Sequence, residues 1–556
     1  MQVKFTHHHE TVSIEAGQTI LDAARLADVN ITAQCGGNRK CARCTIRLIS
    51  GEAIVTEEEK RLLGDKKLAS GIRLACCAVP LSDVVVDAEV SKSKAAILTT
   101  SIINDYKLNP LLTKRHSAQD DTTTVSDGRG PFAKEAGDTT ALLYGICIDI
   151  GTTTVAVKLV DVNTGETIDV CSEMNRQKAF GADVLNRIGF SWESEKNMRL
   201  VSSTIRKQID SMIGEMLGER NITPSNVYAV VIAGNTAMLQ LLAQIDCSRL
   251  GKMPFEAELS GEVVFSPQEL ELTNTHEKAE VFLMPIIGSF VGGDTTSCVV
   301  ASQMHKAEGV TVLVDIGTNG EIVLNTGKQM IASSTAAGPA LEGVRIASGM
   351  QAAPGAIDRC RFTGTDIATG TIGHQPAKGT CGSGLIDAIA AMIDAGVLNK
   401  LGSFTDKPEE LPEAIQKRIV RDGNNPRFIL DFDSDIAITQ RDVRELQLAC
   451  GAIKAGVTIL LKRFGLTAAD VRQLLLAGGF GSFINKASAC KAGLLPVLPE
   501  EKIISIGNAA LAGAKRVLLD KAARREAIDL SGAIEHFELA TNLDFQTEFA
   551  EAMIYP

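Results

Sequence analysis

The chain has 556 residues, of which 45% are apolar and 22% charged, and its net charge is −11 with a single Trp. The length predicts roughly two to four domains. An acidic chain with few aromatic residues argues against nucleic-acid binding, which needs a basic face. No apolar run reaches about 18 residues, which excludes a membrane-spanning helix. The first residues read directly into a strand and not into a signal-peptide core, so we expect a cytoplasmic protein.

Residues 1–90 are predicted to form a small α+β domain with a grasp-like fold. Short strands are expected over 3–6, 11–14, 45–49 and 84–86, where β-branched residues dominate or alternate with polar ones. Thr19 and Asp22 have capping-box spacing before an Ala- and Leu-rich helix. Thr56 precedes a second helix that is expected to end near Gly64.

Four of the 13 cysteines have the spacing of an iron–sulfur site. Cys35, Cys41 and Cys44 form a C-x5-C-x2-C segment, and Cys76 follows further along the domain. Three thiolates on one loop with a distant fourth are typical of a [2Fe–2S] cluster. Zinc is the alternative, but a zinc site would normally show two C-x2-C pairs. Cys77 could replace Cys76 as the fourth ligand.

Residues 91–143 are predicted to be a linker. The stretch over 117–124 and the Asp-, Gly- and Lys-containing residues that follow it have almost no apolar side chains. Such a composition is typical of a flexible connection. We therefore expect the first domain to move relative to the rest of the chain.

From Tyr144 onward, strands alternate with helices and the chain contains an internal repeat. Asp149 begins the segment Asp-Ile-Gly-Thr-Thr, and Asp315 begins Asp-Ile-Gly-Thr-Asn, each after an apolar run. The separation of the two copies is long enough for an α/β domain in each. Residues 144–556 are therefore predicted to form a duplicated domain, with its two halves meeting near residue 300 and a cleft between them.

The repeated segments predict a nucleotide site. In each, the Gly lets the backbone approach a phosphate, the following N–H and hydroxyl groups donate to it, and the strand-end Asp can hold Mg²⁺ through water. The candidate phosphate and Mg²⁺ ligands are Asp149, Gly151, Thr152, Thr153, Asp315, Gly317, Thr318 and Asn319. Gly478 and Gly479 follow a third apolar strand and would admit adenosine, whereas Asp294 and Glu321 are candidate catalytic acids. No P-loop motif is present in the sequence.

Taken together, these segments resemble the two phosphate motifs and the adenosine motif of the superfamily that contains actin, sugar kinases and heat-shock chaperones. The resemblance implies a multidomain α/β protein. A β-grasp, ferredoxin-like domain would be followed by a duplicated actin-like (ribonuclease H-like) ATPase domain that binds ATP and Mg²⁺.

The combination of both domains resembles the reductive activators of corrinoid proteins. The matching segments lie over 180–185, 234–238, 290–294, 314–321, 334–339, 381–387 and 506–510. The resemblance implies ATP-dependent reduction of an inactive cobalt(II) corrinoid to cobalt(I), with electrons passed through the [2Fe–2S] cluster. The implied partners are a corrinoid protein of a methyltransferase system in an anaerobe and a reduced ferredoxin or flavodoxin-like donor; a homodimer is also expected.

The sequence is expected to differ from that family in two respects, and two alternative functions remain. The chain is expected to lack the extra middle domain of some relatives, and it has no C-terminal cysteine cluster for [4Fe–4S] centres. An actin-superfamily kinase with a sensory iron–sulfur domain is the first alternative. An ATP-dependent activator of another redox enzyme is the second.

Overall fold

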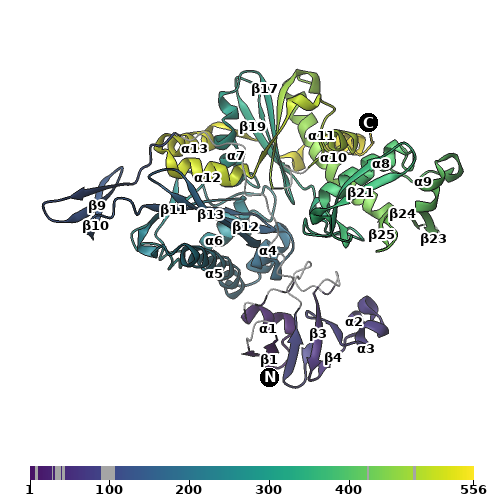
Figure 1. The fold of residues 1–556 in the computed structure, drawn as a ribbon, viewed down its shortest axis with the longest axis horizontal. Helices are drawn as coiled ribbons and strands as arrows, with labels where there is room; N and C mark the ends of the chain where they lie inside the picture. The colour runs from purple at the N-terminus through teal and green to yellow at the C-terminus, as the bar shows by residue number, and fades with distance from the viewer. Residues whose placement is uncertain are drawn as a thin grey trace.

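The computed structural model describes residues 1–6, 11–27, 29, 31, 39, 44–88, 107–422, 425–479 and 484–556. In chain order these residues form a small α+β domain, a three-stranded sheet and two larger α/β halves (Figure 1). Two predicted cluster ligands, Cys35 and Cys41, lie outside the described residues. Within the described part of the chain, no helix is both long and apolar enough to cross a membrane.

The first domain is a β-grasp fold, as predicted. Its sheet has the order β2-β1-β7-β3-β5, in which β1 runs parallel to β7 and antiparallel to β2. The strands are β1 (Gln2–Phe5), β2 (Thr11–Ser13), β3 (Thr45–Ser50), β5 (Ile72–Leu74) and β7 (Val84–Asp87); β4 (Ala53–Ile54) pairs separately with β6 (Val79–Pro80). Helix α1 (Ile20–Leu26) begins at the predicted capping box, and α2 (Glu57–Leu63) ends at Gly64 before α3 (Asp65–Ala69).

The prediction of a flexible linker up to residue 143 is wrong for the part that the structure describes. Residues 113–136 form an antiparallel sheet of β8 (Thr113–Ser117), β9 (Thr122–Asp127) and β10 (Gly130–Ala136), whose β9–β10 hairpin projects from the body of the molecule (Figure 1). The sequence misleads because a projecting sheet buries few side chains, so that polar Thr residues, which favour strands, replace apolar ones. Val125 is one of the few fully buried apolar residues of these strands.

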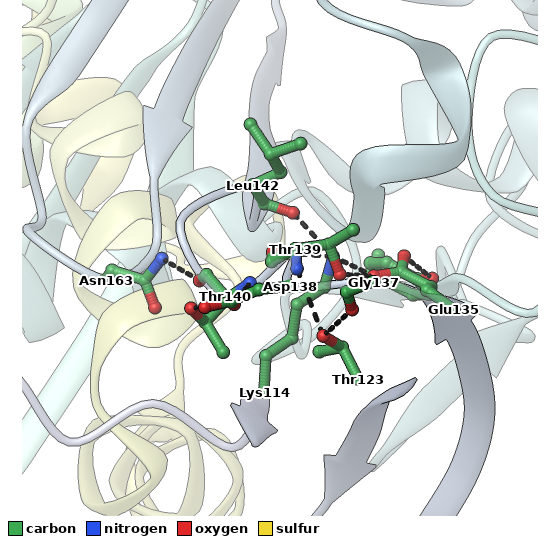
Figure 2. Close-up of polar contacts among 10 residues, drawn as sticks. Lys114, Thr123, Glu135, Gly137, Asp138, Thr139, Thr140, Leu142 and Asn163 are labelled. Carbon is green, nitrogen blue, oxygen red and sulfur yellow. Dashed lines mark hydrogen bonds and ion pairs between the residues drawn. The ribbon is translucent and has the colours of Figure 1, made fainter. Parts of the chain in front are cut away.

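A buried lysine fastens this sheet to the first α/β half (Figure 2). The ammonium of Lys114 in β8 donates to Glu135 at 2.6 Å and to the carbonyl oxygen of Leu142 at 2.7 Å, and its side chain is fully buried. Tyr228 of the first half donates to the same carboxylate at 2.6 Å and lies beneath the Lys114 ammonium. Asn163 adds a bond to the carbonyl oxygen of Thr140 at 3.0 Å. The ion pair between Lys114 and Glu135 joins β8 to β10 within the sheet, while the contacts of Tyr228 and Asn163 attach the sheet and the segment after it to the first half.

The sheets of the two α/β halves share the same topology over five strands, which confirms the predicted duplication. The orders are β13-β12-β11-β14-β16-β15 and, read in the matching direction, β28-β19-β18-β17-β26-β27. In both sheets three antiparallel strands (β13-β12-β11 and β19-β18-β17) are followed by two strands that run parallel to the last of them (β14 and β16, β26 and β27). The sixth strands are placed differently, since β15 pairs with β16 and β28 with β19. The first sheet contains β11 (Tyr144–Ile150), β12 (Thr154–Asp161), β13 (Thr167–Met174), β14 (Val227–Gly234), β15 (Val263–Phe265) and β16 (Glu280–Leu283). The second contains β17 (Val310–Ile316), β18 (Gly320–Asn325), β19 (Met330–Thr335), β26 (Val471–Ala477), β27 (Ile503–Gly507) and β28 (Glu535–His536).

Helices cover both faces of each sheet. On the outer faces lie α4 (Val184–Trp192), α5 (Glu195–Arg220) and α6 (Thr236–Ala243) for the first sheet, and α8 (Gly382–Asp394) and α10 (Gln440–Arg463) for the second. A shared layer of α7 (Gly293–Ser302), α12 (Ala509–Leu519) and α13 (Lys521–Ala533) joins the inner faces in one hydrophobic core. In this layer a Cβ atom at Gly513 would lie 2.0 Å from the carbonyl oxygen of Ser297, so the backbones of α7 and α12 touch.

A smaller lobe is inserted between β19 and β26 of the second half and packs beside α8 (Figure 1). Its sheets are β20 (Ala356–Phe362), β21 (Ile367–Thr371) and β22 (Gly379–Thr380), and β23 (Ile419–Asp422), β24 (Asn425–Asp431) and β25 (Ile436–Thr439). The remaining helices are α9 (Glu413–Arg418), α11 (Lys486–Lys491) and α14 (Phe545–Ala552). This lobe supplies one wall of the cavity described next.

Candidate functional site

The two halves enclose a cavity of about 580 Å³ that collects every nucleotide-site residue predicted from the sequence. Its lining includes Asp149, Gly151, Thr152, Thr153, Asp294, Asp315, Gly317, Thr318, Asn319, Glu321, Gly478 and Gly479. The first four belong to the turn between β11 and β12, and their counterparts belong to the turn between β17 and β18. The duplication therefore places two equivalent hairpins opposite each other across one cavity.

Small residues let the hairpin backbones border the cavity. The amide of Gly151 donates to the carbonyl oxygen of Thr154 at 2.9 Å, and a Cβ atom at this glycine would lie 2.8 Å from that oxygen. Gly478 adopts a φ of +91°, and a Cβ atom there would lie 2.7 Å from Oδ1 of Asp315. Only glycine fits such a position without strain, so the third glycine segment and the second hairpin are in direct contact.

Burial raises the pKa values of four acidic side chains that line the cavity. Burial raises the pKa of Asp149 to about 7, although a hydrogen bond from Asn508 at 2.9 Å opposes the shift. Burial also raises the pKa of Asp315 to about 6 and that of Asp294 to about 8, the latter with help from the neighbouring aspartates. For Glu321, burial and then the charge of Asp294 hold the pKa well above its usual value. A cation in the cavity would relieve this repulsion.

Two polar residues of the cavity, Glu342 and Asn508, are not among the predicted site residues. The carboxylate of Glu342, next to β19 and the following turn, accepts hydrogen bonds from the hydroxyls of Thr153 and Thr318, and thus joins the two hairpins. Nothing in its local sequence distinguishes it. Asn508 stands in the predicted segment over 506–510, where it caps α12 and holds Asp149. The hydrogen bonds that join the two hairpins through Glu342 require the hairpins to face each other across the cavity. Only the three-dimensional structure shows these bonds.

In the first domain, two of the predicted cluster ligands converge. The sulfur atoms of Cys44 and Cys76 are 3.2 Å apart, and both residues are buried. The hydrogen bond between the two sulfur atoms lowers the pKa of the Cys44 thiol to about 7 and raises that of Cys76. The Cys77 sulfur lies 3.9 Å from that of Cys76, and burial raises its pKa. Converging thiols, of which Cys44 has a lowered pKa, fit an iron–sulfur cluster, which is held by thiolates.

A buried ion pair positions the strand that leads to Cys76. The guanidinium of Arg73 in β5 makes two bonds to the Glu59 carboxylate, at 3.0 and 2.8 Å, and the same carboxylate accepts the amide of Leu74 at 2.7 Å. Arg73 also donates to the carbonyl oxygen of Ile54 at 2.5 Å. Paired bonds of this kind fix geometry as well as contributing energy, so the pair anchors the chain next to the cysteine.

The described residues hold no tight group of metal-binding side chains. No three His, Cys, Asp or Glu residues in the described part of the chain lie close enough together to hold a metal ion. This finding does not cover Cys35 and Cys41, because both lie outside that part. Separated carboxylates, as in the nucleotide cavity, suit Mg²⁺, which commonly binds one or two carboxylates together with waters and substrate phosphates.

Comparison with known families agrees with both sites. The model of the 2Fe-2S iron-sulfur cluster binding domain matches residues 5–81, that of the RACo middle region matches 144–307, and that of the C-terminal domain of RACo, the ASKHA domain, matches 309–556. The expectation that a middle domain is missing is therefore wrong. The fold and the site together define an iron–sulfur ferredoxin domain coupled to an actin-like ATPase domain.

Individual relatives narrow this class to one family. A corrinoid activation enzyme, RamQ, of Eubacterium limosum is 33% identical over 72% of this chain and 69% of its own length. A [Co(II) methylated amine-specific corrinoid protein] reductase of Methanosarcina barkeri is 26% identical over 74% of this chain and 77% of its own. The solved reductive activator for a corrinoid, iron-sulfur protein superposes with a TM-score of 0.74 at 28% identity, covering 100% of this chain and 98% of that one. The chain belongs to the family of reductive activators of corrinoid proteins.

Proposed function

We propose that this protein reduces the inactive cobalt(II) form of a corrinoid protein to cobalt(I), in a reaction coupled to ATP. The observation that carries the proposal is the presence, in one chain, of converging cluster thiols and of a cavity between two duplicated phosphate hairpins. The related proteins named above, an activation enzyme and a reductase of corrinoid proteins, support it. One electron from a reduced ferredoxin or flavodoxin-like donor converts cobalt(II) into cobalt(I).

Each domain has its own part in this reaction. Cys35, Cys41, Cys44 and Cys76 would hold the [2Fe–2S] cluster, which supplies one-electron transfer when bound. We place these ligands in a domain over 1–90 that is connected through 91–143 to the ATPase domain over 144–556, whose halves divide near residue 300. The corrinoid protein is taken from a methyltransferase system. We also propose a cytoplasmic location and a homodimer for the working protein.

In the ATPase domain, the two hairpins would hold the nucleotide from both sides. Thr152 and Thr153 on one side and Thr318 and Asn319 on the other offer backbone N–H and side-chain donors to the phosphates. Asp149 and Asp315 would hold Mg²⁺ through water molecules, and the cation would favour their charged forms, which burial disfavours.

The remaining predicted residues complete the nucleotide site. Gly478 and Gly479 leave room for adenosine, and Asp294 and Glu321 would position water or the metal. ATP can favour one arrangement of the two halves only through its different affinity for the alternatives.

The test is to mix the reduced protein with a cobalt(II) corrinoid protein and to follow the cobalt(I) absorbance with and without ATP. Cobalt(I) is expected only with ATP, and both Cys44→Ala and Asp315→Ala should abolish it. Asp433→Ala, at an exposed position of the same half, serves as the control and should leave it intact. ATP hydrolysis with every partner still in the cobalt(II) state would contradict the proposal. Phosphorylation of a small substrate would then favour a kinase, and its absence an activator of another redox enzyme.

A further inference from the structure

An arginine of α1 connects the first domain to the ATPase domain. Arg25, in the last turn of α1, donates to the carbonyl oxygen of Ala179 from Nε at 3.0 Å and from Nη2 at 2.7 Å. Ala179 ends a short 3₁₀ helix (Arg176–Ala179) between β13 and α4, and α4 lies on the side of the first half that faces α1 (Figure 1). A fork of two bonds to one oxygen is a geometry that guanidinium can form and that a lysine ammonium cannot.

The surroundings hold this arginine in place. The guanidinium carbon lies 5.3 Å from the ring centre of Phe180 and 4.8 Å from that of Phe190, and the two rings stack on each other at 5.0 Å. The Arg25 side chain is 8% exposed. Cation–π contacts gain strength when the cation is removed from water, so this contact fixes α1 against the aromatic pair.

Arg25 also interacts within its own domain. It forms an ion pair with Asp22 at 3.4 Å and would interact electrostatically with an ionised Cys76, one of the predicted cluster ligands. The arginine therefore touches the ATPase domain, and its charge acts at the same time on a thiol of the predicted cluster site. No other cation of α1 is available for this purpose, since Arg25 is the only basic residue of that helix.

A continuous set of contacts leads from this interface to the nucleotide cavity. Arg187 in α4 is fully buried and donates from Nε to the carbonyl oxygen of Gly181 at 2.9 Å and from Nη2 to that of Thr152. A Cβ atom at Gly181 would lie 2.9 Å from the backbone nitrogen of Arg187, so the segment after Ala179 packs directly on α4. Thr152 lines the cavity within the first phosphate hairpin.

We propose that Arg25 couples the nucleotide site to the position of the ferredoxin domain. The bistable element is the ferredoxin domain itself, which is either fastened to the segment over 179–181 or released from it. Nucleotide contacts at the hairpin bias this equilibrium through Arg187, and docking biases nucleotide affinity by the same factor, as linkage requires. The inference rests on the proposed function in one respect, namely that the cavity binds ATP.

Hydrogen exchange and nucleotide affinity of the full chain with its cluster bound test the inference. In the wild type, MgATP is expected to change amide exchange in α1 and over 176–187. Arg25→Ala should abolish the change in α1, speed exchange over 176–187 and alter the dissociation constant of MgATP by about fivefold or more, the range typical of coupled sites. Arg25→Lys, which keeps the charge but loses the fork, should show the same loss of response. Arg61→Ala, at an exposed position of the same domain, is the matched control and should behave as wild type.

The outcomes separate this inference from the function on which it rests. Both Arg25 variants could bind MgATP with the affinity of the wild type and show the same MgATP-induced change in amide exchange as the wild type. This result would overturn the coupling and leave the proposed function intact. Failure of the wild type to bind MgATP would overturn both. Visible absorbance of the cluster in each variant shows that the ferredoxin domain has folded.

Discussion

The ion pair between Glu59 and Arg73 offers a sharp test of how the ferredoxin domain is held together. Replacing Glu59 by Gln keeps the size of the side chain and lets its oxygen still accept the amide of Leu74. The new NH₂ group, however, would face the N–H groups of Arg73, which would remain buried without a counter-charge. Breaking a buried pair in this way typically costs about 3–5 kcal/mol.

This loss of stability can be measured as a decrease in the melting temperature of the domain. In a domain of this size, about 1 kcal/mol shifts the melting temperature by roughly 4–8 °C, so Glu59→Gln should lower the temperature of cluster loss by at least about 10 °C. The assay heats the anaerobic full chain and follows the visible absorbance of the cluster at one scan rate, because cluster loss is irreversible. Glu58→Gln, an exposed neighbour on α2, is the matched control. Equal temperatures for the two variants would refute the reasoning.

Three further predictions concern the cysteines and the cavity. Cys76→Ser should abolish the visible absorbance and the bound iron, whereas Cys77→Ser should retain both; iron and sulfide analysis checks this, and the reverse result would show that Cys77 is the ligand. Because burial raises the pKa of Asp149 to about 7, the stability gained by its neutral form is complete below about pH 4 and is lost as the pH rises through about 7. The nucleotide-free protein should accordingly melt at lower temperature at about pH 8 than at about pH 5, and Asp149→Asn should flatten this slope in calorimetry; an unchanged slope counts against the burial argument. Gly478→Ala should destabilise the protein and weaken ATP binding more than Gly465→Ala, because both have positive φ but only the first would bring a Cβ atom against Asp315; equal melting temperatures and affinities would contradict this.

The phosphate hairpins can be recognised from the sequence because the residues that form each of them are neighbours in the chain. A strand-end Asp, a Gly and residues with hydroxyl or amide groups stand close together in each segment, so Gly151 and Gly317 can be found from a few neighbouring residues. The duplicated topology follows from the recurrence of that segment. The long helix α10 is also recognisable from the sequence, since its apolar residues recur at helical spacing.

The residues that sequence reasoning missed act across the fold. Glu342 becomes notable only when both hairpins donate to it, and Arg25 only when α1 meets the segment near Ala179. Neither residue stands in a sequence motif that would identify it. The three-stranded sheet was misjudged for a related reason, because polar strands with few buried residues resemble a linker in composition.

The contact between Gly513 and Ser297 restricts how the two halves can rearrange. With the backbones of α7 and α12 touching, neither helix can slide past the other without separating, but each can rotate about the point of contact. The inner faces of both sheets pack on these helices, so a rotation of one half against the other has its axis there. Because residue 513 is a glycine without a side chain, the two helices touch here and this contact sets the axis. For a given rotation, the displacement of a residue grows in proportion to its distance from this axis.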